Sequence, residues 1–122
     1  MESVFLKIPE NSILYRNEAF FIIKDRYPVS QGHLLIISNR LCRDYFMLSP
    51  EELVLLPDTI AVAKEIIEKE NQPHGYNIGM NCGAAAGQTV FHFHCHVIPR
   101  YEGDIHDPRG GVRHCVEGKG YY

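Results

Sequence analysis

Three histidines, His92, His94 and His96, alternate with Phe93 and Cys95 in the last third of the chain. This alternation has the period of a β-strand, so the imidazole rings are predicted to share one face of a strand and the apolar side chains the other. Rings two residues apart on a strand lie roughly 6.6 Å apart, which lets one small anion contact two of them. Titratable rings are costly to bury without partners, so the histidine face predicts a cleft and the apolar face predicts a core.

Closely spaced histidines serve three kinds of site: a metal centre, a nucleophilic or acid–base catalytic site, and a structural cluster satisfied by backbone carbonyls. A metal centre needs a carboxylate or thiolate beside the imidazoles, yet Val90 and Ile98, the neighbours on the same face, offer no ligand. Catalysis on an anion needs hydrogen-bond donors, and Gly83, Gly87 and residues 88–89 can expose consecutive backbone N–H groups. The pattern favours catalysis on an anionic group.

Length and composition limit the classes of protein that fit. With 122 residues, 45% hydrophobic and 22% charged, the chain predicts a single domain over residues 1–122. A net charge of -3 and a pI near 6.1 give no basic surface for a nucleic-acid polymer, and no apolar run reaches the roughly 18 residues of a membrane span. The four cysteines lack C-x-x-C spacing and the first nine residues lack the features of a secretory signal, so we expect a cytoplasmic protein.

One long helix is predicted in the middle of the chain. Ser49 can cap its first turn, Pro50 fits the first helical position, and Glu52 completes a capping box. Apolar residues then recur at helical spacing up to Lys69. Pro57 lies beyond the first turn, where it removes a hydrogen bond and clashes with the preceding turn, so we expect a kink or a break there.

Runs of β-branched and aromatic residues predict the strands around this helix. A loop or one-turn helix is expected at residues 3–8, and a brief strand at residues 13–15. Longer strands are predicted at residues 19–24, 33–38, 76–81 and 88–99, and the chain after residue 100 is predicted to be mostly loop. These elements predict an α+β fold, in which an antiparallel sheet of about five strands packs against one long helix, with a short helix in addition.

A set of short motifs resembles one known family. The motifs are His92-Phe93-His94-Cys95-His96-Val97-Ile98, the preceding Asn81-Cys82-Gly83 and Gly87-Gln88-Thr89-Val90, and Asp25 with the run from Pro28 to His33. On these residues the chain resembles the histidine triad (HIT) family of nucleotide hydrolases and transferases, and the resemblance covers nearly the whole chain. Pro99-Arg100 and Gly103-Asp104 are similar to the branch that hydrolyses diadenosine polyphosphates.

The resemblance implies a catalytic role for four histidines. His94 would attack the α-phosphorus of a nucleotide and form a nucleotidyl-histidine. The backbone carbonyl of His92 would hold the His94 ring in the required tautomer, and His33 would brace the ring of His92. His96, in its protonated form, would contact the phosphate oxygens and stabilise charge or assist the leaving group.

The resemblance also implies a set of substrate-binding residues. Gln88 and Asn81 would form hydrogen bonds near the scissile phosphate, and Thr89 and Val90 would supply main-chain donors. Asp25 would bind the ribose hydroxyls, although the alternative of a turn residue stays open. The base pocket would be lined by Val4, Phe5, Ile8 and Ile23, of which Phe5 and Ile23 could equally be ordinary core residues.

The resemblance bears on metals and cofactors as well. Many family members carry a C-x-x-C pair and a further histidine that bind a structural zinc ion with the first histidine of the triad. This chain has Ser3, Leu6 and Leu41 at those places. We therefore expect no bound metal, with Leu6 and Leu41 filling the space by apolar contact. No cofactor is expected to be required, although a divalent cation can accompany a polyphosphate substrate.

Together these features predict an enzyme that hydrolyses a nucleotidyl phosphoanhydride or phosphoramidate. As the resemblance implies, it would be a homodimer whose two sheets meet edge to edge. The favoured substrate is a diadenosine polyphosphate, with release of AMP. The alternatives are a nucleoside phosphoramidase or adenylylsulfate hydrolase, and a nucleotide-binding regulatory module with little turnover.

Overall fold

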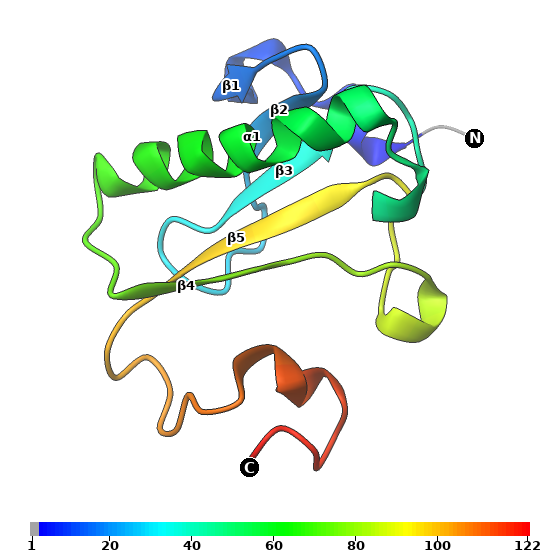
Figure 1. Cartoon of the computed structure of the whole chain (residues 1–122). Helices are drawn as coiled ribbons and strands as arrows, with labels where there is room; N and C mark the ends of the chain where they lie inside the picture. Colours follow the sequence, from blue (N-terminus) through cyan, green and yellow to red (C-terminus); the bar gives the residue numbers. More distant parts are fainter. Residues whose placement is uncertain (1–2) are drawn as a thin grey trace.

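The sheet determines where the histidines lie. The computed structural model describes residues 3–122, which form five antiparallel strands in the order β1-β2-β3-β5-β4 (Figure 1). The predicted α+β fold is confirmed, although the strand ends shift, most of all at the start of β5. The strands are β1 (Tyr15–Arg16), β2 (Phe20–Lys24), β3 (Leu34–Ser38), β4 (Gly75–Gly79) and β5 (His94–Arg100). The α-helix α1 spans Pro50–Glu68, and short 3-10 helices span Val4–Lys7 (η1), Glu10–Ser12 (η2), Tyr45–Met47 (η3), Ala84–Ala86 (η4) and Gly111–Cys115 (η5).

α1 begins as its sequence predicts. The Ser49 hydroxyl accepts the N–H of Glu52 and the Glu52 carboxylate accepts the N–H of Ser49, which together form a capping box. The break that was one of the two outcomes expected at Pro57 does not occur, and Figure 1 shows one continuous helix. Leu53 and Pro57 are both exposed, so the Leu53 carbonyl, which lacks the N–H partner that residue 57 would otherwise supply, can bind water. Among residues 3–122, no helix has both the length and the apolar character that a bilayer span requires.

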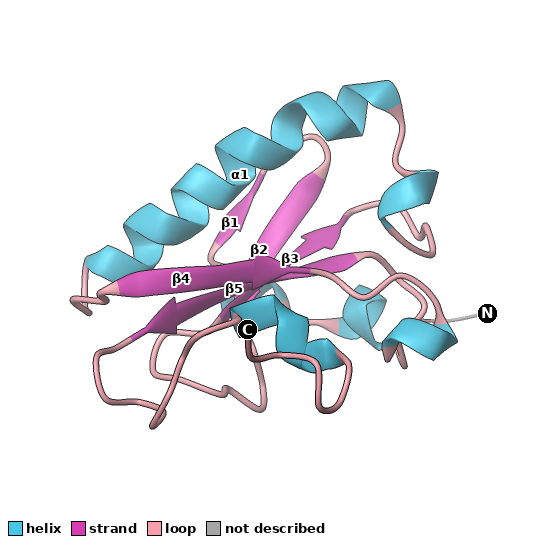
Figure 2. Cartoon of the chain, turned by 60° about the horizontal axis from the view of Figure 1, so that its bottom comes forward, coloured by secondary structure: helices cyan, strands magenta, loops and turns pink. Residues whose placement is uncertain are grey.

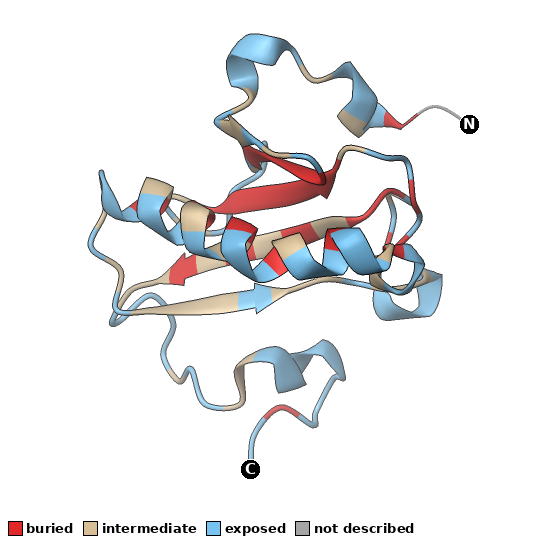
Figure 3. Ribbon diagram, turned by 45° about the horizontal axis from the view of Figure 1, so that its top comes forward, coloured by how far each residue is buried: buried red, intermediate tan, exposed pale blue. Residues whose placement is uncertain are grey.

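The two faces of the sheet are covered by different parts of the chain. Figure 2 shows α1 on one side, with η1 and η5 on the other. Figure 3 shows that β2 and β3 are mostly buried, whereas much of the outer surface of α1 is exposed. The core under α1 contains Phe20, Ile22, Ile36, Cys95 and Val97 from the sheet and Leu56, Ala63 and Ile67 from the helix. The opposite core contains Phe21, Ile23, Leu35 and Ile37, covered by Phe5, Ile8 and Ile13.

β5 contributes to both faces. Cys95 and Val97 are fully buried under α1, which places the half-buried His94 and His96 on the opposite face. Burial raises the pKa of the Cys95 thiol to about 12. The thiol therefore stays protonated, and Cys95 fills the core as predicted.

β5 is shorter than predicted, because it begins at His94 and residues 88–93 form no strand. Just before it, the N–H of Phe93 donates to the carbonyl of Cys42 at 2.7 Å. Phe91, which the alternation assigns to the core face, is 41% exposed. Alternation predicts which residues share a face while a strand lasts, but it does not predict where pairing with the neighbouring strand begins.

Candidate active site

His94 lies on β5 opposite Ile37 of β3, with its ring on the face away from α1. Its Nδ1 lies 2.8 Å from the backbone carbonyl oxygen of His92. A carbonyl oxygen only accepts hydrogen bonds, so Nδ1 carries the proton and the neutral ring keeps a lone pair on Nε2. This is the tautomer that the resemblance implies, and its free nitrogen can attack an electrophile.

His92 is fully buried and does not face a cleft. Its Nε2 lies 2.7 Å from the carbonyl oxygen of Ser38, and its Nδ1 lies 2.7 Å from the hydroxyl oxygen of Ser3. Burial lowers the pKa of His92, which favours the neutral ring. The expectation that His33 braces this ring is wrong, because His92 precedes β5 and turns its ring inward to the two serines. Its carbonyl is the group that reaches His94.

His33 and His96 form a second pair. The backbone N–H of Val29 donates to Nδ1 of His33 at 3.1 Å, so the proton of the neutral His33 ring lies on Nε2. This Nε2 lies 2.9 Å from Nδ1 of His96, which therefore accepts the hydrogen bond. The proton of His96 then lies on its own Nε2. The tautomers of His94 and His96 are complementary, because one ring offers a lone pair and the other offers an N–H.

His96 is neutral at neutral pH. Burial, assisted by His33 and His94, lowers the pKa of His96 to about 4, although the Asp25 carboxylate acts in the opposite direction. In the free protein the ring loses hydration and faces two other imidazoles, which favours the neutral form, and the protonated His96 expected in contact with a phosphate stays a prediction. A neutral His96 still donates its Nε2–H, and the negative charge of a bound phosphate would favour its protonation.

Asp25 follows β2 and supports this pair. One carboxylate oxygen accepts the N–H of Tyr27 at 2.8 Å, which is the turn contact that the sequence left open. The other oxygen lies 3.2 Å from Nε2 of His33 and 3.6 Å from Nδ1 of His96. The side chain is 13% exposed. Asp25 therefore shapes the turn and contacts the histidine pair, and its contact with a ribose stays a prediction.

The cavity beside Asp25 has the size and the lining of a nucleoside pocket. It has a volume of about 460 Å³, and Ile8 and Ile23 line it together with Asp25. Phe5 packs in the same apolar layer, and its ring centroid lies 5.1 Å from that of His94. Phe5 therefore contacts the ring of the proposed nucleophile on one side and packs with Ile8 and Ile23, which line the cavity, on the other.

Other predicted binding residues lie elsewhere. Val4 is 62% exposed and lines a separate cavity of about 430 Å³ with Thr89 and Val90, so its assignment to the base pocket is wrong. The reason is that η1 turns alternate side chains in different directions, with Phe5 inward and Val4 outward. Asn81 is exposed and lines a third cavity, of about 360 Å³, together with His96. The predicted phosphate contacts of Asn81, Thr89 and Val90 stay predictions.

Gln88 is used inside the protein. Its amide oxygen accepts the N–H of Gly83 at 2.8 Å, and its amide nitrogen donates to the carbonyls of Arg43 at 2.6 Å and Val90 at 3.2 Å. Gln88 is only 4% exposed. The expected contact of this amide with a phosphate is therefore not the arrangement in the structure. Gln88 instead holds the loop before β5 against the segment after β3.

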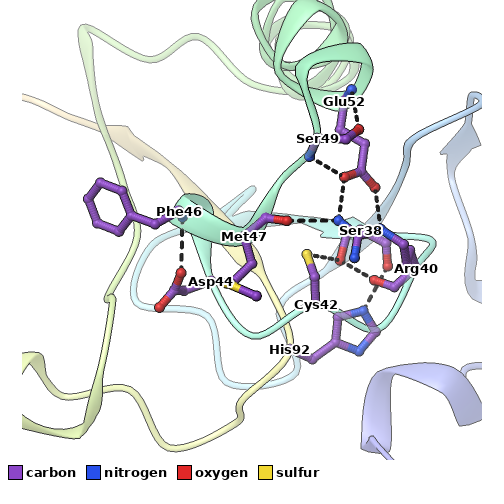
Figure 4. A network of polar contacts seen from close by, with 9 residues as sticks. All are labelled: Ser38, Arg40, Cys42, Asp44, Phe46, Met47, Ser49, Glu52 and His92. Atoms are coloured by element: carbon purple, nitrogen blue, oxygen red, sulfur yellow. Dashed lines mark hydrogen bonds and ion pairs between the residues drawn. The ribbon is translucent and has the colours of Figure 1, made fainter.

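The Ser38 carbonyl that holds His92 is tied to the start of α1 by a polar network (Figure 4). The Ser38 hydroxyl donates to the carbonyl of Arg40 at 2.7 Å. The Arg40 guanidinium donates to Glu52 at 2.7 Å and to the carbonyl of Met47 at 2.8 Å. Helix α1 thereby fixes the strand end on which the first histidine depends.

Ser3, Val29 and Ser38 are positioning residues that the sequence does not indicate. Val29 contacts His33 through its backbone N–H, and Ser38 contacts His92 through its backbone carbonyl. Backbone groups do not depend on the residue type, so the sequence cannot indicate these contacts. The only signal at Ser3 in the sequence is that a serine stands where many members of the HIT family have a zinc-binding cysteine. Its hydrogen bond to His92 joins residues 89 positions apart, and such a pairing depends on the tertiary fold.

The residues do not fit the structural zinc of the C-x-x-C members. The Ser3 hydroxyl lies 2.7 Å from Nδ1 of His92 and occupies the position that a metal ion would need on this nitrogen. Leu6 is 53% exposed and Leu41 is 43% exposed, so the expected apolar filling by these two side chains is wrong. A hydrogen bond from Ser3 satisfies His92 instead.

Asp25, His33 and His96 bring three potential metal-ligand atoms within 4.8 Å of one another. A metal ion on Nε2 of His33 would require the proton to move to Nδ1. The N–H of Val29 donates to that nitrogen, so a proton there would face another N–H group. The three residues are therefore better suited to a chain of hydrogen bonds that fixes His96 than to a metal centre.

The buried imidazoles should make the stability of the fold depend on pH. Burial lowers the pKa of His33, His92 and His96, that of His96 to about 4 from 6.5. As the pH falls, the histidines of the unfolded chain bind protons at a higher pH than those of the folded chain. The free energy of unfolding is therefore highest above pH 6.5 and falls as the pH decreases toward 4. Denaturant titration should show a loss of about 2 kcal/mol between pH 7 and 4.5 from His96 alone. An equally steep loss in a His96→Asn variant would contradict this origin.

Comparisons with known proteins agree with the fold and the motif. A HIT domain family model matches residues 7–103. The chain is 35% identical over 102 residues to bis(5'-nucleosyl)-tetraphosphatase [asymmetrical] of Schizosaccharomyces pombe, covering 83% of this chain and 56% of the relative. It is 31% identical over 106 residues to AP-4-A phosphorylase of Mycobacterium tuberculosis, covering 82% of this chain and 54% of the relative. The chain thus spans little more than half the length of these two curated relatives.

Solved structures show the same architecture. A HIT family protein from Bacillus anthracis superposes with a TM-score of 0.76 at 36% identity, covering 84% of this chain and 76% of that protein. A HIT family member from Bacillus subtilis superposes with the same TM-score of 0.76 at 29% identity, covering 85% of this chain and 77% of that protein. The matching family model, the relatives and the arrangement of the three histidines on β5 and before it show that this chain belongs to the HIT family.

Proposed function

We propose that this chain is a nucleotidyl hydrolase or transferase in which His94 attacks the α-phosphorus of a nucleotide. The observation that carries the proposal is the 2.8 Å hydrogen bond from Nδ1 of His94 to the carbonyl of His92, which leaves a lone pair on Nε2. The ring of His96, 5.5 Å away between centroids, supports the proposal because its N–H can stabilise a phosphoryl oxygen that gains negative charge. The names of the two curated relatives, a tetraphosphatase and an AP-4-A phosphorylase, support a nucleotide substrate.

The reaction would proceed in two displacements. In the first, the Nε2 lone pair of His94 forms a bond to phosphorus while the bond to the leaving oxygen breaks, and the leaving group departs with that electron pair. The ring becomes positively charged, and its Nδ1–H remains on the carbonyl of His92. In the second, water attacks phosphorus and releases a proton, while the N–P pair returns to Nε2 and the nucleoside monophosphate is set free.

The favoured substrate is a diadenosine polyphosphate, which would yield AMP. The cavity of about 460 Å³ lined by Ile8, Ile23 and Asp25 would hold one nucleoside, and Phe5 in the same apolar layer contacts His94. Adenosine phosphoramidate and adenylylsulfate present the same nucleoside with a different leaving group, so they would occupy this cavity in the same way. Steady-state kinetics with all three compounds tests the assignment. The highest kcat/KM is expected for the diadenosine polyphosphate, and a preference for either other compound would replace it. Absence of turnover with all three, together with nucleotide binding in equilibrium dialysis, would identify a nucleotide-binding module instead.

Chelation is expected to leave the chemistry intact. No step needs a metal ion, and the Nε2 of His33 that would have to bind one carries a proton because Val29 donates to Nδ1. After exhaustive chelation, the rate with adenosine phosphoramidate should be unchanged, since this substrate has no polyphosphate chain that pairs with a divalent cation. The rate with diadenosine polyphosphate can fall through the loss of the substrate's own cation. A phosphoramidate rate that disappears and returns with one equivalent of metal ion would contradict the proposal.

We also propose that the protein acts as a homodimer in the cytoplasm. β4 is an edge strand of the sheet, and its Ile78 is 44% exposed, which supports pairing with the same edge of a second copy. Its four cysteines are free thiols, which supports a reducing compartment. Sedimentation equilibrium of the wild type and of an Ile78→Lys variant would test the dimer, because a charge at this edge should shift the equilibrium to monomer.

A further inference from the structure

We infer that Ser3 is a positioning residue that holds His92 in one tautomer and thereby fixes the carbonyl that orients His94. The inference rests on the proposed role of His94 as nucleophile. Ser3 is 7% exposed, and its hydroxyl oxygen lies 2.7 Å from Nδ1 of the fully buried His92. The same oxygen accepts the N–H of Phe5 at 3.2 Å. One side chain therefore connects the first turn of η1 to the histidine motif.

The direction of each hydrogen bond follows from the partners. Nε2 of His92 lies 2.7 Å from the Ser38 carbonyl, which only accepts, so Nε2 carries the proton of the neutral ring. Nδ1 is then a buried acceptor that needs a donor, and the hydroxyl of Ser3 is placed to donate to it. Ser3 can donate to His92 and accept from Phe5 at the same time, because a hydroxyl has one donor and two acceptor positions.

The hydrogen bond between Ser3 and His92 affects the position of the His94 ring through the backbone of residue 92. The ring of His92 is fixed at both nitrogens, so the backbone of residue 92 and its carbonyl are fixed as well. That carbonyl accepts the Nδ1–H of His94 at 2.8 Å. Phe5, held by the same serine, places its ring edge 5.6 Å from His92 and 5.1 Å from His94 between centroids. Loss of the Ser3 hydroxyl would remove one hydrogen bond that fixes the His92 ring and one that fixes the backbone of Phe5.

The test combines a spectrum with a rate. In the wild type, 15N–1H correlation spectra of the imidazoles should show His92 protonated on Nε2 and hydrogen-bonded but unprotonated on Nδ1. In Ser3→Ala this pattern should be lost, and the single-turnover rate of nucleotidyl transfer to His94 should fall roughly 10- to 100-fold through misplacement. Ser3→Thr keeps a hydroxyl and should restore both. Thr59→Val is the matched control, because it removes a buried hydroxyl that donates to the carbonyl of Leu55 and accepts from the amide of Asn17, with no contact to His92.

Three results would overturn the inference. The first is a wild-type spectrum with the His92 proton on Nδ1, which needs no variant to fold. The second is Ser3→Ala with an unchanged rate and spectrum. The third is an equal loss of rate in Thr59→Val, which would assign the effect to general stability. If the wild type forms no adduct and has no turnover, the proposed function fails, while the His92 spectra of the wild type and Ser3→Ala still decide whether Ser3 sets the tautomer.

Discussion

The His94→Ala variant is expected to lose turnover by roughly 10,000-fold or more. No neighbouring ring can replace the missing nitrogen. His92 is fully buried with both ring nitrogens hydrogen-bonded, and His96 carries its proton on Nε2 while its Nδ1 accepts from His33. Nucleotide affinity should stay nearly unchanged, because the cavity beside Asp25 does not depend on the His94 ring. Rapid-quench kinetics measures the rate, and equilibrium dialysis measures the affinity.

The matched control for this substitution is His106→Ala. His106 is an exposed histidine in the chain after β5, so its loss removes an imidazole without changing the site. The control should keep the wild-type rate and affinity. A His94→Ala variant that retains a substantial fraction of the wild-type rate would contradict nucleophilic attack by this ring, whereas a parallel loss of affinity would indicate that His94 serves binding.

The His96→Ala variant should discriminate between leaving groups. In the substrate complex the phosphate charge would favour a protonated His96, with the Asp25 carboxylate facing its Nδ1–H. This ring would give its Nε2 proton to the leaving group and return to the neutral form. An amine leaving group must gain a proton as it departs, whereas a polyphosphate leaves as a stable anion. The rate with adenosine phosphoramidate should therefore fall roughly 100- to 10,000-fold, and the rate with diadenosine polyphosphate should fall much less. Single-turnover measurements with both substrates test the difference.

That experiment is decided by how much more the rate falls with adenosine phosphoramidate than with diadenosine polyphosphate. Equal losses would mean that His96 stabilises the phosphoryl oxygens without protonating the leaving group. A His33→Asn variant adds a positioning test, because it removes the hydrogen bond to Nδ1 of His96 but keeps the His96 ring. In this variant the rate with adenosine phosphoramidate should again fall more than the rate with diadenosine polyphosphate, but by a smaller factor than in His96→Ala. Wild-type rates with both substrates would contradict the role of the Val29–His33–His96 chain of hydrogen bonds.

The sequence predicts the faces of β5 correctly because alternation is a local property. Cys95 and Val97 are in the core, and His94 and His96 are on the opposite face. At His92 only the expected cleft is wrong: its ring packs against Phe5, as the ring of His94 does, but is fully buried. The alternation itself ends at Phe91, which is exposed, where pairing with β3 has not yet begun. The rule of period two applies only while inter-strand hydrogen bonds hold the backbone extended.

The partners of individual polar groups could not be predicted, because they depend on register and tertiary contacts. His33 contacts His96 because β3 and β5 are paired with Leu35 opposite His96, and nothing in the local sequence specifies that register. Gln88 is used internally because the loop before β5 lies against the carbonyl of Arg43. A motif therefore identifies which residue types gather at a site, whereas the fold decides which atoms meet.

The most direct test of the account is to locate the covalent intermediate. The wild-type protein is mixed with a stoichiometric nucleotide substrate, quenched in alkali because the adduct is labile in acid, and analysed by peptide mass spectrometry and 31P–15N NMR. We expect one nucleotidyl group on His94, bonded through Nε2, since Nδ1 is held by the carbonyl of His92. An adduct on Nδ1, on His92 or on His96, or turnover without any nucleotidyl-histidine, would contradict the central claim.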